Sequence, residues 1–200
     1  MILSHLAYAA AWAVFGACHS LAAGETAKRA LAPLLGRGYR LGYNLFAVAL
    51  FIAVGMVGAW ALGAEPLFAL PAWGKAALAT IHLCGWAVML LAARYYDLGR
   101  LGGLYQLRHP DQPEDEDLHL GGPHRWVRHP LYAGAFLILW GGAVSPLGLA
   151  TALWGSLYLL IGTACEEKRL LRRYGDAYAH YCAQVPAFIP WRGRLPAIDS

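Results

Sequence analysis

The longest apolar run in this chain extends from Leu131 to Cys165 and reads LYAGAFLILWGGAVSPLGLATALWGSLYLLIGTAC. It is too long to be one bilayer-crossing helix, which needs about 20 apolar residues. Its centre is rich in residues that favour turns, namely Gly141, Gly142, Ser145, Pro146 and Gly148. We therefore predict a helical hairpin whose first helix is short and does not fully span the membrane.

Three further apolar runs precede this hairpin: Ile2 to Ala23, Leu41 to Leu62 and Ala76 to Ala93. Each is close to the length of one membrane span. The whole chain of 200 residues is 58% hydrophobic and only 14% charged, which is too apolar for an ordinary soluble domain. These features predict an all-α, polytopic membrane protein of one domain with about five hydrophobic helices.

The basic residues predict how the helices are oriented. Fifteen of the sixteen Lys and Arg residues follow the first, third or fifth helix, and Lys75 alone lies in the other loops. Cytoplasmic loops retain Lys and Arg, so we expect the N-terminus outside and the C-terminus in the cytoplasm, in a bacterial inner membrane. The formal charge of +4 is explained by this rule, and we expect membrane lipid but no nucleic acid as a partner.

The four cysteines indicate no metal site. Cys18, Cys84 and Cys165 lie in or at the ends of apolar helices, Cys182 lies near the C-terminus, and no CxxC or other metal-ligand spacing occurs. We interpret them as buried free thiols and predict no bound metal.

Two polar segments flank the hairpin. The first, Gly122 to Gly134, reads GPHRWVRHPLYAG, and the second, Glu166 to Pro190, reads EEKRLLRRYGDAYAHYCAQVPAFIP. Folding the hairpin brings cations, imidazoles and carboxylates together at the membrane surface, where each is costly unless it is paired or bound. Pro130 is suited to the first position of a helix, whose N-terminus is a potential anion site. We therefore predict a polar ligand site here.

The second segment should begin as a continuation of the last apolar helix. We expect this helix to run to about Tyr174 and to stop at Gly175. Tyr174, Tyr178 and Tyr181 are spaced to share one face of a following helical turn, and we interpret them as anchors at the membrane interface.

These two segments resemble the signature of the isoprenylcysteine carboxyl methyltransferase and phospholipid methyltransferase superfamily, over roughly residues 95 to 190. The resemblance implies a membrane enzyme that uses S-adenosyl-L-methionine without a Rossmann fold, and no strand-borne GxGxxG motif occurs in the chain. Together with the apolar runs and the length of the chain, it predicts three regions: three N-terminal helices in 1–93, a cofactor-binding region in 94–190 on the cytoplasmic side, and a tail in 191–200, with 1–190 forming a single domain.

The same resemblance implies which residues contact the cofactor. They are Gln106, Leu118, His119, Leu120, His124, His129, Pro130, Leu131, Tyr132 and Glu166. The chain departs from the superfamily at two positions. His124 stands where a tyrosine is usual, and Gly162 stands where the carboxyl methyltransferases have the arginine that holds the substrate carboxylate. Because a buried carboxylate without a cation is costly, Gly162 argues against a prenylcysteine acceptor.

The N-terminal half is similar to the NnrU-like family and the bacterial methanethiol S-methyltransferases. The similarity lies in His19-Ser20, in YRLGYN from Tyr39 to Asn44, and in the stretch Asp97 to Leu107. From the residues alone, we interpret His19 as a membrane-interface histidine satisfied by a neighbouring helix, and His5 and His82 in the same way.

These observations predict transfer of a methyl group from S-adenosylmethionine to a small or lipophilic nucleophile, most simply a thiol. Thiolate is the reactive form of a thiol, which has a pKa of about 8.5. Arg128 is our candidate to stabilise the thiolate, and Glu167 or His124 to accept the proton. The alternatives are a phospholipid or isoprenylcysteine methyltransferase and a non-enzymatic, NnrU-like membrane accessory protein.

Overall fold

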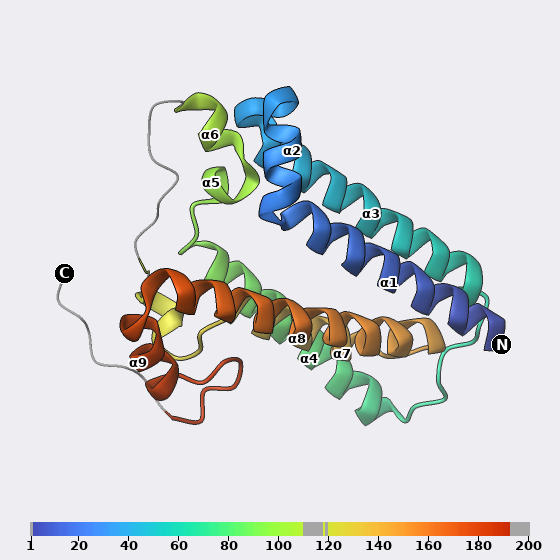
Figure 1. Cartoon of the computed structure of the whole chain (residues 1–200). Coiled ribbons are helices and arrows are strands. Elements are labelled where there is room, and N and C mark those ends of the chain that lie inside the picture. The colour runs from blue at the N-terminus through green and yellow to red at the C-terminus, as the bar shows by residue number, and fades with distance from the viewer. Residues whose placement is uncertain (1, 110–117, 119, 193–200) are drawn as a thin grey trace. The chain divides into compact units, whose positions relative to one another are not determined.

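The computed structural model describes residues 2–109, 118 and 120–192, which form helices joined by turns and loops (Figure 1). The long helices are α1 (Ile2–Ala23), α3 (Tyr39–Leu62), α4 (Ala72–Ala93) and α8 (Pro146–Tyr174). The shorter ones are α2 (Glu25–Leu35), α5 (Leu98–Gly102), α6 (Leu104–Arg108), α7 (Pro130–Gly141) and α9 (Asp176–Gln184), with 3₁₀ turns η1 (Gly36–Gly38) and η2 (Gly122–Arg125).

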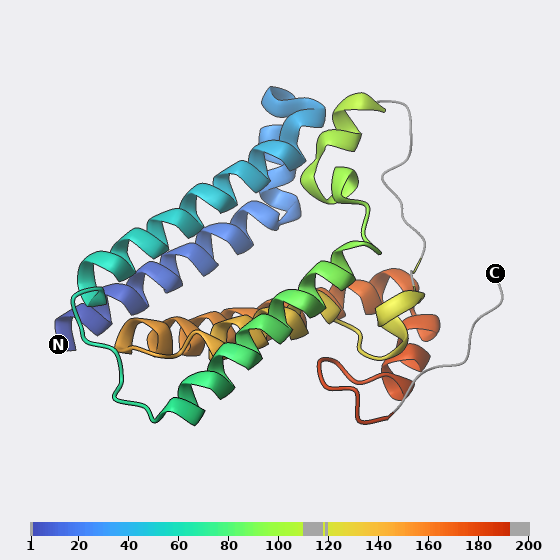
Figure 2. The same ribbon diagram turned by 180° about the vertical axis from the view of Figure 1, so that it is seen from behind.

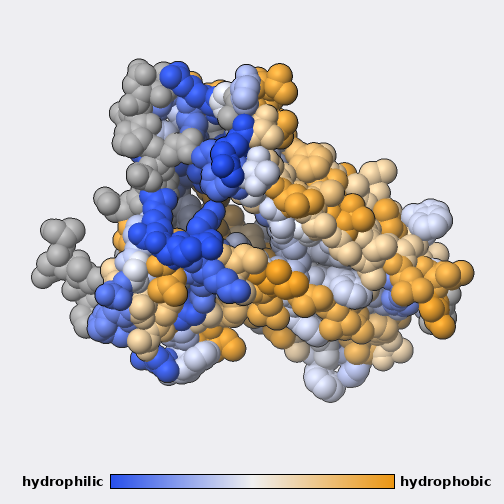
Figure 3. Space-filling view, viewed as in Figure 1, coloured by the Kyte–Doolittle hydropathy of each residue, from blue (hydrophilic) through white to orange (hydrophobic). Residues whose placement is uncertain are grey.

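Four helices are long and apolar enough to cross a membrane, and α7 is a shorter apolar helix. The prediction of an all-α, polytopic membrane protein with five hydrophobic helices is therefore confirmed. Large apolar side chains stand exposed along these helices, such as Trp60 at 81% and Trp73 at 77%. Figure 3 shows hydrophobic residues covering the visible flanks of α1 and α3. Lipid, rather than water, is the solvent that tolerates such a surface.

The chain forms two compact units. The first contains residues 2–66 and 97–109, and the second contains residues 67–96, 118 and 120–192. In the first unit, α1 packs against α3 through Tyr8, Trp12 and Phe15, which are buried on one face of α1. Phe51 of α3 meets Trp12 edge to face, with ring centroids 6.1 Å apart.

The start of α3 binds the turn between α5 and α6 within the first unit. Asn44 donates hydrogen bonds from Nδ2 to the carbonyls of Leu101 at 2.9 Å and Gly102 at 3.1 Å. Gly103 joins α5 to α6 with φ of 93°, and a Cβ at this position would lie 2.5 Å from the backbone nitrogen of Leu41. Only glycine fits a positive φ and so close an approach, which fixes the direction in which α6 leaves.

In the second unit, α4 packs closely against α7 (Figure 2). A Cβ on Gly85 would lie 2.6 Å from the backbone nitrogen of Ile138, and a Cβ on Gly134 would lie 3.0 Å from the carbonyl oxygen of Gly85. Small residues at facing positions let two membrane helices approach this closely, so that their dispersion contacts and backbone dipoles hold them together.

This close packing leads to a first prediction. Gly85→Ala should destabilise the protein by about 1–3 kcal/mol, because the added methyl group meets backbone atoms that have no room to move. Gly55→Ala is the matched control, since a Cβ there meets nothing within 4 Å and alanine favours the α3 helix. Thermal unfolding of the two variants in the same detergent measures the difference, and equal unfolding temperatures would contradict the close α4–α7 contact.

Two histidines are satisfied by neighbouring helices, as predicted. His82 Nδ1 lies 2.9 Å from the carbonyl oxygen of Ile138, and Trp86 Nε1 donates to His82 Nε2 at 3.0 Å. Because the carbonyl needs a donor and the indole needs an acceptor, the ring is neutral with its proton on Nδ1. His19 Nε2 lies 2.5 Å from the Tyr43 hydroxyl, which belongs to α3.

The hairpin also forms as predicted. The turn between α7 and α8 contains Ser145, whose hydroxyl accepts a hydrogen bond from the backbone nitrogen of Gly148 at 3.0 Å and caps α8. Farther along, Trp140 Nε1 donates to Ser156 Oγ at 3.0 Å and ties the two arms together. The other end of α8 is Tyr174, and Gly175 with φ of 55° follows it, which is the predicted stop.

Candidate active site

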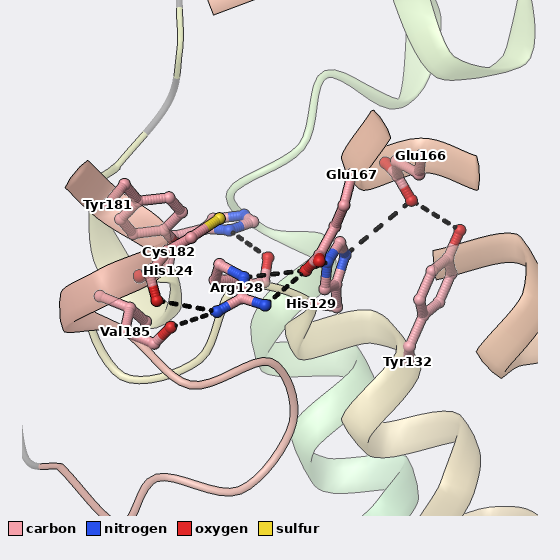
Figure 4. Close-up of polar contacts among 9 residues, drawn as sticks. All are labelled: His124, Arg128, His129, Tyr132, Glu166, Glu167, Tyr181, Cys182 and Val185. Atoms are coloured by element: carbon pink, nitrogen blue, oxygen red, sulfur yellow. Dashed lines mark hydrogen bonds and ion pairs between the residues drawn. The ribbon is translucent and has the colours of Figure 1, made fainter. Parts of the chain in front are cut away.

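The two arms of the hairpin meet in a cluster of charged side chains, shown in Figure 4. Arg128, just before α7, donates from Nε at 2.9 Å and from Nη2 at 2.6 Å to Oε1 of Glu167, on α8. His129 Nε2 lies 2.9 Å from the same oxygen. A carboxylate oxygen only accepts, so the His129 nitrogen is the donor. One oxygen of Glu167 thus accepts three hydrogen bonds and links both predicted segments.

Glu166, the neighbouring carboxylate, faces the first turn of α7. The hydroxyl of Tyr132 donates to its Oε2 at 3.0 Å, and His129 Nδ1 lies 3.9 Å from the same oxygen. The rings of His129 and Tyr132 are nearly parallel, at 9°, with centroids 5.6 Å apart. His129, which is only 6% exposed, therefore lies between two carboxylates and against an aromatic ring.

Arg128 is also held by the chain after α9. Its Nη1 donates to the carbonyls of Val185 at 2.5 Å and Cys182 at 3.3 Å. The backbone nitrogen of Arg128 donates to the carbonyl oxygen of Pro186 at 2.9 Å, and the backbone nitrogen of His129 donates to the carbonyl oxygen of Ala187 at 3.0 Å. We call residues 185–187 the strap, because they run alongside Arg128 and His129 and bind both. Burial lowers the pKa of Arg128, but the hydrogen bond and charge of Glu167 more than offset this and raise it.

His124 is positioned by its neighbours in the second unit. Its Nδ1 lies 3.1 Å from the carbonyl oxygen of Arg128, and its own carbonyl accepts a hydrogen bond of 2.6 Å from the Tyr181 hydroxyl. A carbonyl requires a donor, so the His124 proton is on Nδ1 and a neutral ring has its lone pair at Nε2.

Tyr96 belongs to this site and was not predicted from the sequence. It follows α4, and its ring centroid lies 5.4 Å from that of His124. Burial and the negative charge of Glu166 raise the pKa of Tyr96 to about 12, so its hydroxyl keeps its proton at neutral pH and remains a donor. One feature of the sequence could have indicated it, which is the Tyr-Tyr pair shortly after a membrane helix and directly before Asp97.

The remaining predicted residues have different surroundings. Pro130 is buried at the first position of α7, and Leu131 follows it in the first turn. Leu118 and Leu120 pack against the buried cluster of Tyr178, Tyr181 and Val185. His119 lies outside the described residues. Gln106 lies on α6 in the first unit, where its Nε2 donates to the Arg100 carbonyl at 3.2 Å and its Oε1 is buried without a hydrogen-bond partner among the described residues.

The interpretation of the tyrosines as interface anchors is wrong for two of them. Tyr178 and Tyr181, on α9, are only 2% and 4% exposed and form the core beneath the strap with Val185. The positive φ of Gly175 is the reason, because it breaks the helix and turns α9 away from the axis of α8.

Known proteins similar to this chain carry one name repeatedly. A methanethiol S-methyltransferase of Pseudomonas deceptionensis is 34% identical over 128 residues, which cover 62% of this chain and 48% of that protein. A protein of the same name from Mycobacterium tuberculosis is 32% identical over 127 residues, covering 60% and 51%. A protein-S-isoprenylcysteine O-methyltransferase of Schizosaccharomyces pombe is 36% identical over 83 residues, covering 38% and 34%.

These comparisons confirm the resemblance inferred from the sequence motifs. The chain spans about half the length of the methanethiol S-methyltransferases that it matches. No family model matches the chain. No solved structure is significantly similar to it.

Proposed function

We propose that this chain is an integral membrane methyltransferase that uses S-adenosylmethionine and acts on a small thiol. The observation that carries the proposal is the similarity to several proteins named methanethiol S-methyltransferase. The cluster around Glu167 supports it, because it joins the two segments whose sequence suggested a polar ligand site. We further propose that residues 1–190 work as one domain, with the cofactor bound mainly by residues 94–190.

The residues of the site suit this cofactor, which carries a carboxylate, an ammonium group, a sulfonium and hydroxyls. The backbone N–H groups of Leu131 and Tyr132, in the first turn of α7, have no carbonyl within the helix to bind and suit a carboxylate. The carboxylate of Glu166 suits a cationic group or a hydroxyl. Gln106 Oε1, a buried acceptor without a partner among the described residues, suits an N–H donor. We propose these residues, with His124, His129 and Pro130, as cofactor contacts, and Leu118 and Leu120 as their support.

When bound, S-adenosylmethionine supplies an electrophilic methyl group, which a thiolate sulfur takes up as the carbon–sulfonium bond breaks and S-adenosylhomocysteine leaves. The protein must then position the acceptor, exclude water and accept the thiol proton. Arg128, Glu167 and His124 are the proposed catalytic residues. The hydrogen bond from His124 Nδ1 to the Arg128 carbonyl favours His124 as the base, because it leaves the lone pair at Nε2. Arg128 holds Glu167 and adds positive charge near the thiolate.

The acceptor prediction follows from Gly162, on α8. Open space surrounds this position, since a Cβ there would meet nothing within 4 Å. A small neutral thiol needs no cation there, whereas a prenylcysteine would bring a carboxylate without its partner, at a cost of several kcal/mol. We expect methanethiol to be methylated much faster than N-acetyl-farnesylcysteine, with a rate that rises toward the thiol pKa.

An assay of methyl transfer from labelled S-adenosylmethionine to each of the two acceptors, with purified protein in detergent, tests this expectation. Faster turnover of the farnesylated acid would contradict the thiol acceptor and favour the second candidate function, an isoprenylcysteine methyltransferase. The similarity to the fission yeast enzyme supports that candidate. A protein that neither binds S-adenosylhomocysteine nor methylates either acceptor would instead point to the non-enzymatic accessory role.

We also propose an orientation, with the N-terminus outside, the C-terminus in the cytoplasm and the cofactor site at the cytoplasmic face of a bacterial inner membrane. The support is the placement of fifteen of sixteen Lys and Arg residues, which lie after α1, after α4, or in and after the last turns of α8. In a cysteine-free background, an impermeant thiol reagent added to whole cells should label Lys75→Cys and spare Arg108→Cys. The reverse pattern would contradict the orientation.

A further inference from the structure

Thr163, on α8, has a buried hydroxyl that finds no hydrogen-bond partner among the described residues. The residue is only 6% exposed. Other threonines in the apolar helices behave differently, because Thr80 and Thr151 donate to the carbonyls of Ala76 at 2.9 Å and Leu147 at 2.8 Å, one turn before them. That internal bond is the usual solution for a hydroxyl in a membrane helix. A buried hydroxyl that lacks it needs an explanation.

The position of Thr163 supplies one. Thr163 lies three and four residues before Glu166 and Glu167, so it shares their face of α8, one turn closer to the middle of the apolar segment. The same face carries Ser156, which bonds to Trp140 of α7. The pairs Tyr132–Glu166 and Trp140–Ser156 set the register of the hairpin, in which Thr163 lies opposite residues 133–136.

Those residues are Ala-Gly-Ala-Phe, and none of their side chains has a polar atom. The register thus places Thr163 one helical turn from the charged cluster and opposite a stretch of α7 that carries no polar side-chain atom. This is the environment that a small apolar thiol requires, since its carbon end needs apolar contacts and its sulfur needs a single donor.

We propose that Thr163 is a specificity-determining residue that donates its hydroxyl hydrogen to the sulfur of the acceptor thiol. This inference rests on the proposed function and adds to it the residue that recognises the acceptor. A hydrogen bond to sulfur favours the thiolate over the thiol, because the charged acceptor gains more from a donor than the neutral one. The hydroxyl then binds the acceptor and also increases the fraction of the acceptor that is present as thiolate.

Thr163→Val tests the proposal, because valine keeps the shape of threonine and removes only the hydroxyl. We expect the KM for methanethiol to rise about three- to tenfold, as for the loss of one ordinary hydrogen bond. The rate profile should shift to higher pH, while the affinity for S-adenosylhomocysteine stays unchanged. Thr163→Ser should restore the KM and the pH profile. Thr151→Val, on the same helix, is the matched control and should change neither.

Thermal stability provides an independent measurement. If the hydroxyl is kept for the acceptor, the ligand-free Thr163→Val protein should unfold at a temperature higher by about 2–4 °C, because an unsatisfied polar group is replaced by a methyl group. A purely structural hydroxyl predicts the opposite sign. Stability that rises while acceptor affinity falls is thus the expected signature.

Three results would overturn the inference. Weaker binding of S-adenosylhomocysteine by Thr163→Val would assign the hydroxyl to the cofactor. If the parent protein binds S-adenosylhomocysteine and methylates methanethiol, and Thr163→Val has the same KM and pH profile as the parent, the role of Thr163 is refuted and the proposed function stands. A parent protein that does neither would refute both.

Discussion

Replacing Glu167 with alanine is expected to destabilise the protein by about 2–4 kcal/mol. The change leaves Arg128 and His129, whose side chains are 13% and 6% exposed, without their shared carboxylate. Removing one partner of a buried ion pair costs about 3–5 kcal/mol, and the 28% exposure of the Glu167 side chain reduces that figure. For a chain of this length, we expect the unfolding temperature to fall by roughly 4–16 °C.

Two controls isolate the charge from the side chain. Glu167→Gln keeps an oxygen that accepts N–H donors, so it should lose less than half as much stability. Lys168→Ala changes the neighbouring exposed residue and should unfold like the parent. Thermal unfolding in detergent measures all three variants, and a Glu167→Ala protein as stable as the parent would mean that the cluster contributes nothing to the fold.

The second large effect concerns the cofactor. We expect His129→Ala and Glu166→Ala each to weaken binding of S-adenosylhomocysteine by about tenfold or more, which corresponds to the ~1.4 kcal/mol of a lost charge-assisted hydrogen bond. His82→Ala should bind like the parent, because its ring bonds to Ile138 and Trp86 within the protein. Calorimetric titration of the parent and the three variants with S-adenosylhomocysteine measures these affinities. Parent-like affinity in both site variants would show that the two signature segments only support the fold.

Much of the fold was predictable from the sequence because the membrane restricts the possible structures. A long apolar segment has to be helical to satisfy its backbone, so the run from Leu131 to Cys165 and its central glycines were enough to predict the hairpin. The meeting of Arg128 and His129 with Glu167 follows from the same hairpin, since two antiparallel arms bring their ends together.

The contacts made by irregular segments were not predictable in this way. The direction of α9 depends on the positive φ of Gly175, and no periodicity in the sequence reports a single backbone torsion. Tyr178 and Tyr181 therefore looked like surface residues. Tyr96 joins His124 through a contact between residues 28 positions apart, which depends on how α4 packs against α7.

The position of the strap near the C-terminus determines when the site can form during synthesis of the chain. Arg128 and His129 leave the ribosome more than fifty residues before the strap at 185–187 that binds their backbone. At synthesis rates of about 5–20 residues per second, that interval lasts about 3 to 12 seconds. Throughout it, the backbone N–H groups of Arg128 and His129 lack the carbonyl acceptors that the strap provides. The site is thus among the last parts to form, and a ribosome that stops before the strap releases a chain with every membrane helix and an unfinished site.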